Sequence, residues 1–271
     1  MRLQYISSAC VLIEDNGVKI LCDPWLVDGA YLDSWFHYPP LKFQPEQFND
    51  VDFIYISHIH PDHFDPNTLN RMNKKIPIII NNYVSKFLKK NIEEIGFEVI
   101  EFNHNERIHL KNNLHLNVLA ADACNPQLCA QFIGCAVMET TFGATQIDSM
   151  SVIDNEKEIV VNVNDCPWEL ANFSAKLIMN QYDHIDLLLT GYSGAGAYPQ
   201  CFDIPDEEKE KEAQNKKTKF LTYGENYVNL FQPKFFLPFA GRYTLGGKLS
   251  KLNKYRGNPE LDEAFNYFSK S

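Results

Sequence analysis

The chain has 271 residues, of which 45% are hydrophobic, enough for one large α/β domain or two small ones with a sizeable core. Its formal net charge is -10, from 25 Lys and Arg against 35 Asp and Glu. A general binder of phosphate backbones needs a basic surface, so this balance predicts no nucleic-acid partner. The net charge does not exclude a local basic pocket for an anionic substrate.

Cysteine use and hydropathy bear on the cellular compartment. The seven cysteines are odd in number and form no C-x-x-C pair, which is typical of reduced cysteines in the cytosol. The first residues lack the long apolar stretch of a signal peptide, and no apolar run approaches the roughly 20 residues of a membrane span. We therefore expect a soluble cytoplasmic protein without a membrane span.

The first predicted elements surround an Asn-Gly step. Residues 3–23 form a predicted hairpin, because Asn16 and Gly17 lie between two runs rich in β-branched residues. The second arm of this hairpin ends at Asp23. A loop rich in aromatic residues then leads to a strand of buried type at 53–56.

Helices and strands alternate through the rest of the chain. Asp65 and Pro66 provide an N-cap and a first-turn proline, which predicts a helix over 66–74. The charged run 206–219 continues into apolar residues at near-helical spacing and predicts the solvated start of a long helix. The other predicted elements are strands at 76–80, 97–101, 107–110, 114–120, 132–140, 146–153, 158–163, 185–190 and 234–237, and helices at 83–95, 168–180 and 259–268. This order predicts a single α/β domain over residues 1–271, with two sheets face to face and helices outside.

A dense cluster of metal-binding side chains follows the strand at 53–56. His58 and His60 are two residues apart on a loop and can turn toward one point, while Asp62 and His63 can face a second point nearby. Only 8 histidines occur in the chain, so a polar loop with three incidental histidines is a poor explanation. Imidazole and carboxylate ligands suit zinc, iron or manganese. The segment predicts either two adjacent metal sites or one metal beside a carboxylate base.

This segment matches the H-x-H-x-D-H signature and resembles the metallo-β-lactamase superfamily. Residues 21–26 are similar to the early strand of that family, whose aspartate, here Asp23, supports the metal loop from behind the ligands. Residues 162–166 are similar to a later motif whose aspartate, here Asp165, bridges two metals. The resemblance implies a four-layer αββα sandwich of the metallo-β-lactamase type. It implies metal ligands at His58, His60, Asp62, His63 and Asp165.

Within the superfamily, the chain is most similar to the metallo-β-lactamase-like domain of CMP-N-acetylneuraminic acid hydroxylase and to the lactonase-like branch. The likeness lies in segments 190–199 and 237–243 and extends over nearly the whole chain. Those hydroxylases carry a Rieske iron-sulfur domain, and we find no C-x-H pattern for one here. We therefore expect no hydroxylation by the Rieske route from this chain alone.

Three further residues are assigned to a substrate site. Gly194 lies in a glycine-rich loop that can offer backbone N–H groups to an anionic or sugar substrate, although such loops are equally often simple turns. Arg242 can pair with a phosphate or carboxylate, and only the family resemblance favours this over an ordinary surface arginine. Tyr198 is placed in the same site.

The chain also departs from the family pattern. Typical members have a third histidine ligand after a middle strand, where this sequence has Asp122, and a late histidine that this sequence lacks. These differences weaken one of the two sites and favour iron or manganese more than in an ordinary dizinc enzyme. We expect one or two divalent ions, with zinc first and iron or manganese as alternatives.

These residues predict a metal-dependent hydrolase that acts on an ester, lactone, amide or phosphodiester through a metal-activated water. Asp62 would also orient or deprotonate that water. The family likeness alone suggests a small sugar or nucleotide-sugar substrate and a place in carbohydrate metabolism. Two alternatives stay open, a non-heme di-iron oxygenase or oxidoreductase and a non-catalytic metal-binding module, and a homo-oligomer is left open as well.

Overall fold

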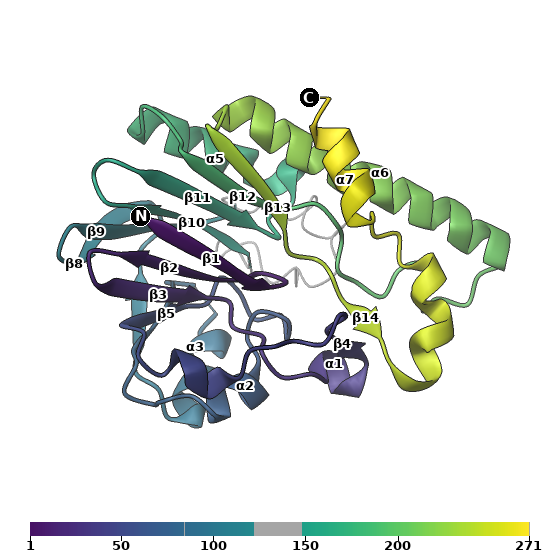
Figure 1. The fold of residues 1–271 in the computed structure, drawn as a ribbon, viewed down its shortest axis with the longest axis horizontal. Helices are drawn as coiled ribbons and strands as arrows, with labels where there is room; N and C mark the ends of the chain where they lie inside the picture. Colours follow the sequence, from purple (N-terminus) through teal and green to yellow (C-terminus); the bar gives the residue numbers. More distant parts are fainter. Residues whose placement is uncertain (84, 122–147, 271) are drawn as a thin grey trace.

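A computed structural model describes residues 1–83, 85–121 and 148–270. Two six-stranded sheets lie face to face, with helices on both outer surfaces (Figure 1). This arrangement is the predicted four-layer αββα sandwich. The predicted strand at 132–140 lies wholly outside the described residues, as do the first two residues of the predicted strand at 146–153.

The first sheet holds the strands from the N-terminal part of the chain, in the order β1-β2-β3-β5-β6-β7. Its members are β1 (Arg2–Ser7), β2 (Cys10–Asp15), β3 (Val18–Cys22), β5 (Phe53–Tyr55), β6 (Ile78–Asn81) and β7 (Val99–Phe102). The predicted hairpin is confirmed, since β2 pairs antiparallel with β3 and positive φ angles at Asn16 and Gly17 close the turn. β3, β5, β6 and β7 run parallel.

The second sheet has the order β13-β12-β11-β10-β9-β8. Its members are β8 (Glu106–Lys111), β9 (Leu114–Ala120), β10 (Ser149–Asp154), β11 (Ile159–Asn164), β12 (Leu187–Gly191) and β13 (Phe235–Phe239). β11, β12 and β13 are parallel, while β8, β9 and β10 pair antiparallel with their neighbours. Two short strands, β4 (Trp35–Phe36) and β14 (Thr244–Leu245), pair outside the main sheets.

Helices cover the outer face of each sheet (Figure 1). The helices of the described residues are α2 (Pro66–Asn70), α3 (Phe87–Ile95), α5 (Trp168–Gln181), α6 (Asp206–Phe231) and α7 (Leu261–Phe268), with 3-10 turns at η1 (Pro45–Phe48) and η3 (Gly247–Tyr255). The short segment α1 (Ala30–Asp33) lies beside β4 and has left-handed backbone angles at Tyr31 and Leu32. α2 and α3 lie against the first sheet, and α5 and α6 against the second. In the described part of the chain, no helix is long and apolar enough to cross a membrane.

The alternation of apolar residues along β2 explains how the first sheet packs on both faces. Val11 and Ile13 point toward the second sheet and join one buried cluster, while Cys10 and Leu12 point toward α2 and α3 and join another. Ile153 of the second sheet belongs to the same buried cluster as Val11 and Ile13, and is fully buried. The core between the sheets therefore fixes their relative position.

Several predicted boundaries were wrong for local reasons. The helix predicted over 66–74 begins as expected, with the Asp65 carboxylate accepting from the Thr68 amide at 3.0 Å, but it ends at Asn70. Its continuation is prevented because the Asn73 amide donates to the side chain of Asn49 at 2.7 Å. The helix predicted from residue 83 begins at Phe87, after a turn near residue 83. The long helix expected from the charged run is confirmed as α6.

The buried position of Ile153 leads to a stability prediction. Ile153→Ala should lower the free energy of unfolding by about 2–5 kcal/mol, because it removes a side chain from the layer between the sheets and leaves a cavity. Phe87→Ala is the control, since that ring is 65% exposed and should change stability much less. Urea unfolding followed by circular dichroism measures both. Equal effects of the two substitutions would contradict this account of the core.

Candidate metal centre

The candidate metal-binding residues meet at one edge of the two sheets. Asp23 follows β3, and the His58 loop follows β5, and these two strands are parallel neighbours. Asp165 follows β11, and Asp148 directly precedes β10, which runs antiparallel to β11. Because parallel strands end together and an antiparallel neighbour begins where they end, all four segments reach the same edge.

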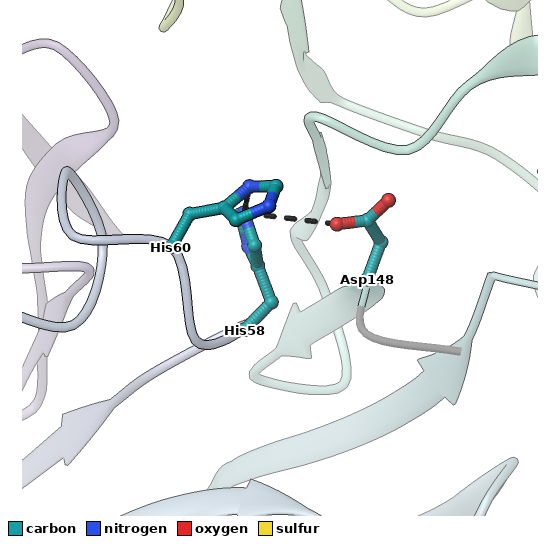
Figure 2. Close-up of side chains that lie close together, drawn as sticks. All are labelled: His58, His60 and Asp148. Carbon is teal, nitrogen blue, oxygen red and sulfur yellow. Dashed lines mark hydrogen bonds and ion pairs between the residues drawn. The ribbon is translucent and has the colours of Figure 1, made fainter. Parts of the chain in front are cut away.

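His58, His60 and Asp148 form a first donor set. Nε2 of His58 lies 2.9 Å from Nδ1 of His60 and 3.6 Å from Oδ1 of Asp148. The donor atoms of all three lie within 4.8 Å of one another. Figure 2 shows both rings on the loop after β5, with the Asp148 carboxylate facing them from the start of β10.

A second donor set lies beside the first: the donor atoms of His63, Asp165 and the shared His58 lie within 4.8 Å of one another, and Asp62 adjoins His63. Nε2 of His63 lies 3.3 Å from Oδ2 of Asp165 and 3.6 Å from Oδ2 of Asp62. The ring of His58 lies between the two sets, with its centroid 4.0 Å from that of His63. The H-x-H-x-D-H loop thus supplies four donors, and the edge of the second sheet supplies two carboxylates.

A buried hydrogen-bond network behind the loop holds these donors in place. Asp23 accepts from the amide of Ser57 at 2.7 Å and from its hydroxyl at 2.9 Å. The side-chain amide of Asn164 donates to both Asp23 and Ser57. Asp23 and Ser57 are fully buried, so each bond is made away from bulk water. This network joins the ends of β3, β5 and β11.

The network also assigns the histidine tautomers. The Ser57 hydroxyl donates its one proton to Asp23, so its oxygen accepts from Nδ1 of His58 at 2.9 Å. His58 therefore carries its proton on Nδ1 and directs the lone pair of Nε2 at the other donors of the first set. Nδ1 of His63 faces Asp23 at 3.4 Å, which leaves Nε2 of His63 for the second set.

Burial and neighbouring charges shift the pKa values of His63, Asp148 and His58. Burial opposes the charged form of His63, but the carboxylates of Asp62, Asp165 and Asp23 raise its pKa well above the usual range. Burial and the charge of Asp165 raise the pKa of Asp148 to about 7. Burial disfavours the imidazolium of His58, and the nearby His63 adds to this effect, so the pKa of His58 lies well below the usual range.

The arrangement fits a divalent cation. His58 Nε2 offers a lone pair, and Oδ1 of Asp148 is buried without a hydrogen-bond partner among the described residues. A cation between them would give these donors the partner that they lack. The two sets together offer three imidazoles and three carboxylates, a mixture that suits zinc, iron or manganese better than calcium or magnesium.

The structure brings together most of the ligands that the sequence suggested. His58, His60, His63 and Asp165 lie in the two groups of close donor atoms, Asp62 lies 3.6 Å from His63, and Asp23 lies 3.4 Å from the other ring nitrogen of His63. Their roles as metal ligands and as a supporting residue stay predictions. Asp122 lies outside the described residues, and its assignment as a ligand stays a prediction.

The three suggested substrate residues have contacts of their own. A Cβ at Gly194 would lie 2.1 Å from the Phe220 ring, so a close approach of loop and α6 explains this glycine. Arg242 donates to Glu260 at 3.2 Å, and the Tyr198 ring packs edge-on against Phe202. These contacts do not join them to a donor set, and their role in substrate binding stays a prediction.

Sequence reasoning missed Asp148 and Tyr31. The predicted strand over 146–153 placed Asp148 inside a strand, but β10 begins at Ser149, so Asp148 lies at the sheet edge instead. Tyr31 belongs to a loop that was read as aromatic and irregular, yet its hydroxyl donates to Oδ1 of Asp62 at 3.2 Å. A carboxylate just before a strand that begins at this edge was the available signal for Asp148.

Comparison with known proteins agrees with this geometry. A family model described as a β-lactamase superfamily domain matches residues 2–132. A Rieske 2Fe-2S iron-sulfur protein of Mycolicibacterium smegmatis is 30% identical over 269 residues, which cover 96% of this chain and 47% of that protein. The cytidine monophosphate-N-acetylneuraminic acid hydroxylase of Danio rerio is 25% identical over 258 residues, 90% of this chain and 38% of that protein. The chain thus spans about half or less of these curated relatives.

Solved structures share the fold. An isothiocyanate hydrolase from Delia radicum gut bacteria matches with a TM-score of 0.65 and 13% identity, over 100% of this chain and 92% of that one. CmlA, a diiron β-hydroxylase from Streptomyces venezuelae, matches with a TM-score of 0.57 and 14% identity, over 99% of this chain and 49% of that one. The chain thus shares the metallo-β-lactamase fold, and the family model over residues 2–132 shows similarity to the β-lactamase superfamily.

The network behind the loop leads to a second stability prediction. Asp23→Asn should lower the free energy of unfolding by about 1–3 kcal/mol, because an amide has one acceptor oxygen where the buried carboxylate serves Ser57 and Asn164 with two. The control is Asp50→Asn, which alters an exposed pair with Lys19 and should have little effect. Thermal and urea unfolding test this, and an undisturbed Asp23→Asn variant would refute the proposed importance of the network.

Metal binding should depend on pH. Asp148 has its pKa raised to about 7, so below that pH a metal must displace a proton from this carboxyl group. The apparent zinc affinity of the first donor set should therefore fall about fivefold between pH 7 and pH 6, as the ionised fraction of Asp148 falls from about one half to about one tenth. Chelator competition measures the affinity, and calorimetry in buffers of different ionisation enthalpy counts the protons released. An affinity that is constant from pH 6 to pH 8 would contradict the assignment of Asp148.

Proposed function

We propose that the chain is a metal-dependent hydrolase with the two donor sets as its metal centre. The observation that carries this proposal is the convergence of six donors, from loops after β5 and β11 and before β10, on two adjoining positions. A bound divalent metal there supplies a Lewis acid that makes a coordinated water acidic near neutral pH. The class of reaction is the one that the isothiocyanate hydrolase of the same fold suggests.

Each residue of the proposed centre would have its own role. His58, His60 and Asp148 would hold the first ion, and Asp62, His63 and Asp165 the second. Asp62 is nearly fully buried and would also orient a water or hold its proton. Asp23 would fix the tautomer of His63, which keeps the second set aligned. The Asp122 assignment as a further ligand is part of this proposal.

The substrate is proposed to be a small ester, lactone, amide or phosphodiester. A sugar or nucleotide-sugar derivative is suggested by the hydroxylase relative, whose name refers to cytidine monophosphate-N-acetylneuraminic acid. Gly194, Tyr198 and Arg242 are retained as candidate substrate contacts. A cytoplasmic location, a role in carbohydrate metabolism and the absence of a nucleic-acid partner remain parts of the proposal.

A second candidate is a non-heme di-iron oxygenase or oxidoreductase. The observation that favours it is the equal number of carboxylates and imidazoles in the two donor sets, with Asp148 where the first set would otherwise be richer in nitrogen. Carboxylate-rich sites suit iron and manganese. The diiron β-hydroxylase with the same fold lends support to this candidate.

His60→Ala tests the centre directly. It should lower the metal content by at least about one ion per chain and reduce hydrolysis by about 100-fold, because His60 is a donor of the first set. His184→Ala is the matched control, since His184 is exposed and contacts the carbonyl of Lys157. Elemental analysis gives the metal content, and a panel of nitrophenyl esters, lactones and phosphodiesters gives the activity.

The outcomes separate the candidates. Zinc or manganese with hydrolysis of one substrate class supports the hydrolase. Iron with oxygen consumption and no hydrolysis supports the oxygenase instead. Protein that takes up no metal, with His60→Ala unchanged in metal content and melting temperature, would leave only a non-catalytic module.

A further inference from the structure

The turn that contains Tyr31 has an unusual backbone. Tyr31, Leu32 and Asp33 all have left-handed conformations, with φ between 53° and 59°. Such a conformation is unfavourable for residues with a Cβ, and a run of three persists only where surrounding contacts enforce it. The side chain of Leu32 is 100% exposed, so burial of this leucine does not maintain the turn.

The contacts that maintain the turn involve its aromatic neighbours. The Tyr31 ring lies 4.2 Å from the Trp35 ring, and Trp35 stacks on Tyr243 at 3.6 Å. Trp35 lies on β4 and Tyr243 directly precedes β14, and these two short strands pair with each other. A C-terminal segment therefore supports Tyr31 through a stack of three rings.

The end of this stack reaches the metal centre. The Tyr31 hydroxyl donates to Oδ1 of Asp62 at 3.2 Å, while the other oxygen of Asp62, Oδ2, faces Nε2 of His63 at 3.6 Å. The hydrogen bond occupies one carboxylate oxygen and leaves the other for the second donor set. A side-chain bond of this kind fixes the rotation of a carboxylate, which otherwise exchanges its two oxygens.

We infer that Tyr31 is a positioning residue, which orients the Asp62 carboxylate for the second metal position and sets the affinity of that position without affecting the first. The inference rests on the proposed function, because it takes the two donor sets as metal sites. In this proposal, the left-handed turn places the Tyr31 hydroxyl against Asp62 from outside the H-x-H-x-D-H loop.

The test is a zinc titration of metal-free Tyr31→Phe, which keeps the ring and its stacking on Trp35 but removes the hydroxyl. Wild-type protein should bind zinc in two steps, and the variant should lose about tenfold to 100-fold in the affinity of one step only. Tyr243→Phe is the matched control: it removes a hydroxyl from the same stack, but one that bonds to Gly196 and Gln200. It should titrate like the wild type.

Each other outcome of the titration would overturn the positioning role of Tyr31, the proposed function, or both. Two unchanged steps in Tyr31→Phe, or an equal weakening of both steps, would overturn the positioning role, since the second result indicates a general structural effect. A single zinc per wild-type chain would overturn the inference and leave the proposed function standing. A wild-type chain that takes up no zinc, iron or manganese would overturn both.

Discussion

The hydrogen bonds between Asp23 and Ser57 are the constraint on which the candidate centre depends. They tie the end of β3 to the start of the histidine loop after β5, inside a region without bulk water. Asn164 extends the same network to the second sheet. Because Ser57 is committed as a donor to Asp23, the tautomer of His58 and the direction of its lone pair follow. A carboxylate that binds no metal in our proposal therefore decides how the ligands point.

The second constraint is the concentration of negative charge at the sheet edge. The charges of Asp165 and Asp62 both raise the pKa of Asp148, and the imidazoles are the neighbouring groups that can balance these carboxylates. Without a bound metal, the carboxylates raise the pKa of His63, so that a protonated His63 balances part of their negative charge. A divalent ion would balance this charge more fully, which supports our proposal of a metal centre over a buried polar cluster.

The relatives limit the possible reactions of this chain only in part. A fold shared at 13–14% identity includes both a hydrolase and a diiron hydroxylase, so the scaffold supports more than one reaction. The chain covers less than half of the curated relatives that it matches in sequence, and their activities belong to longer proteins. What distinguishes reactions on this scaffold is the metal and the residues around it. In our proposal, the choice of metal and reaction depends most on the carboxylate of Asp148 and the phenol of Tyr31.

The sequence by itself determined the histidine loop, the hairpin around Asn16 and Gly17, and the aspartates that follow β3 and β11. These features depend on local patterns, such as close spacing in the chain, turn residues and apolar strands, so a linear reading was sufficient. Only the tertiary structure decided that Asp148 and Tyr31 join them. Asp148 comes to the site because β10 runs antiparallel to β11, and Tyr31 because a C-terminal segment stacks against its loop. Contacts between segments far apart in the chain leave no periodic signal in the sequence, and it is these contacts that complete the centre.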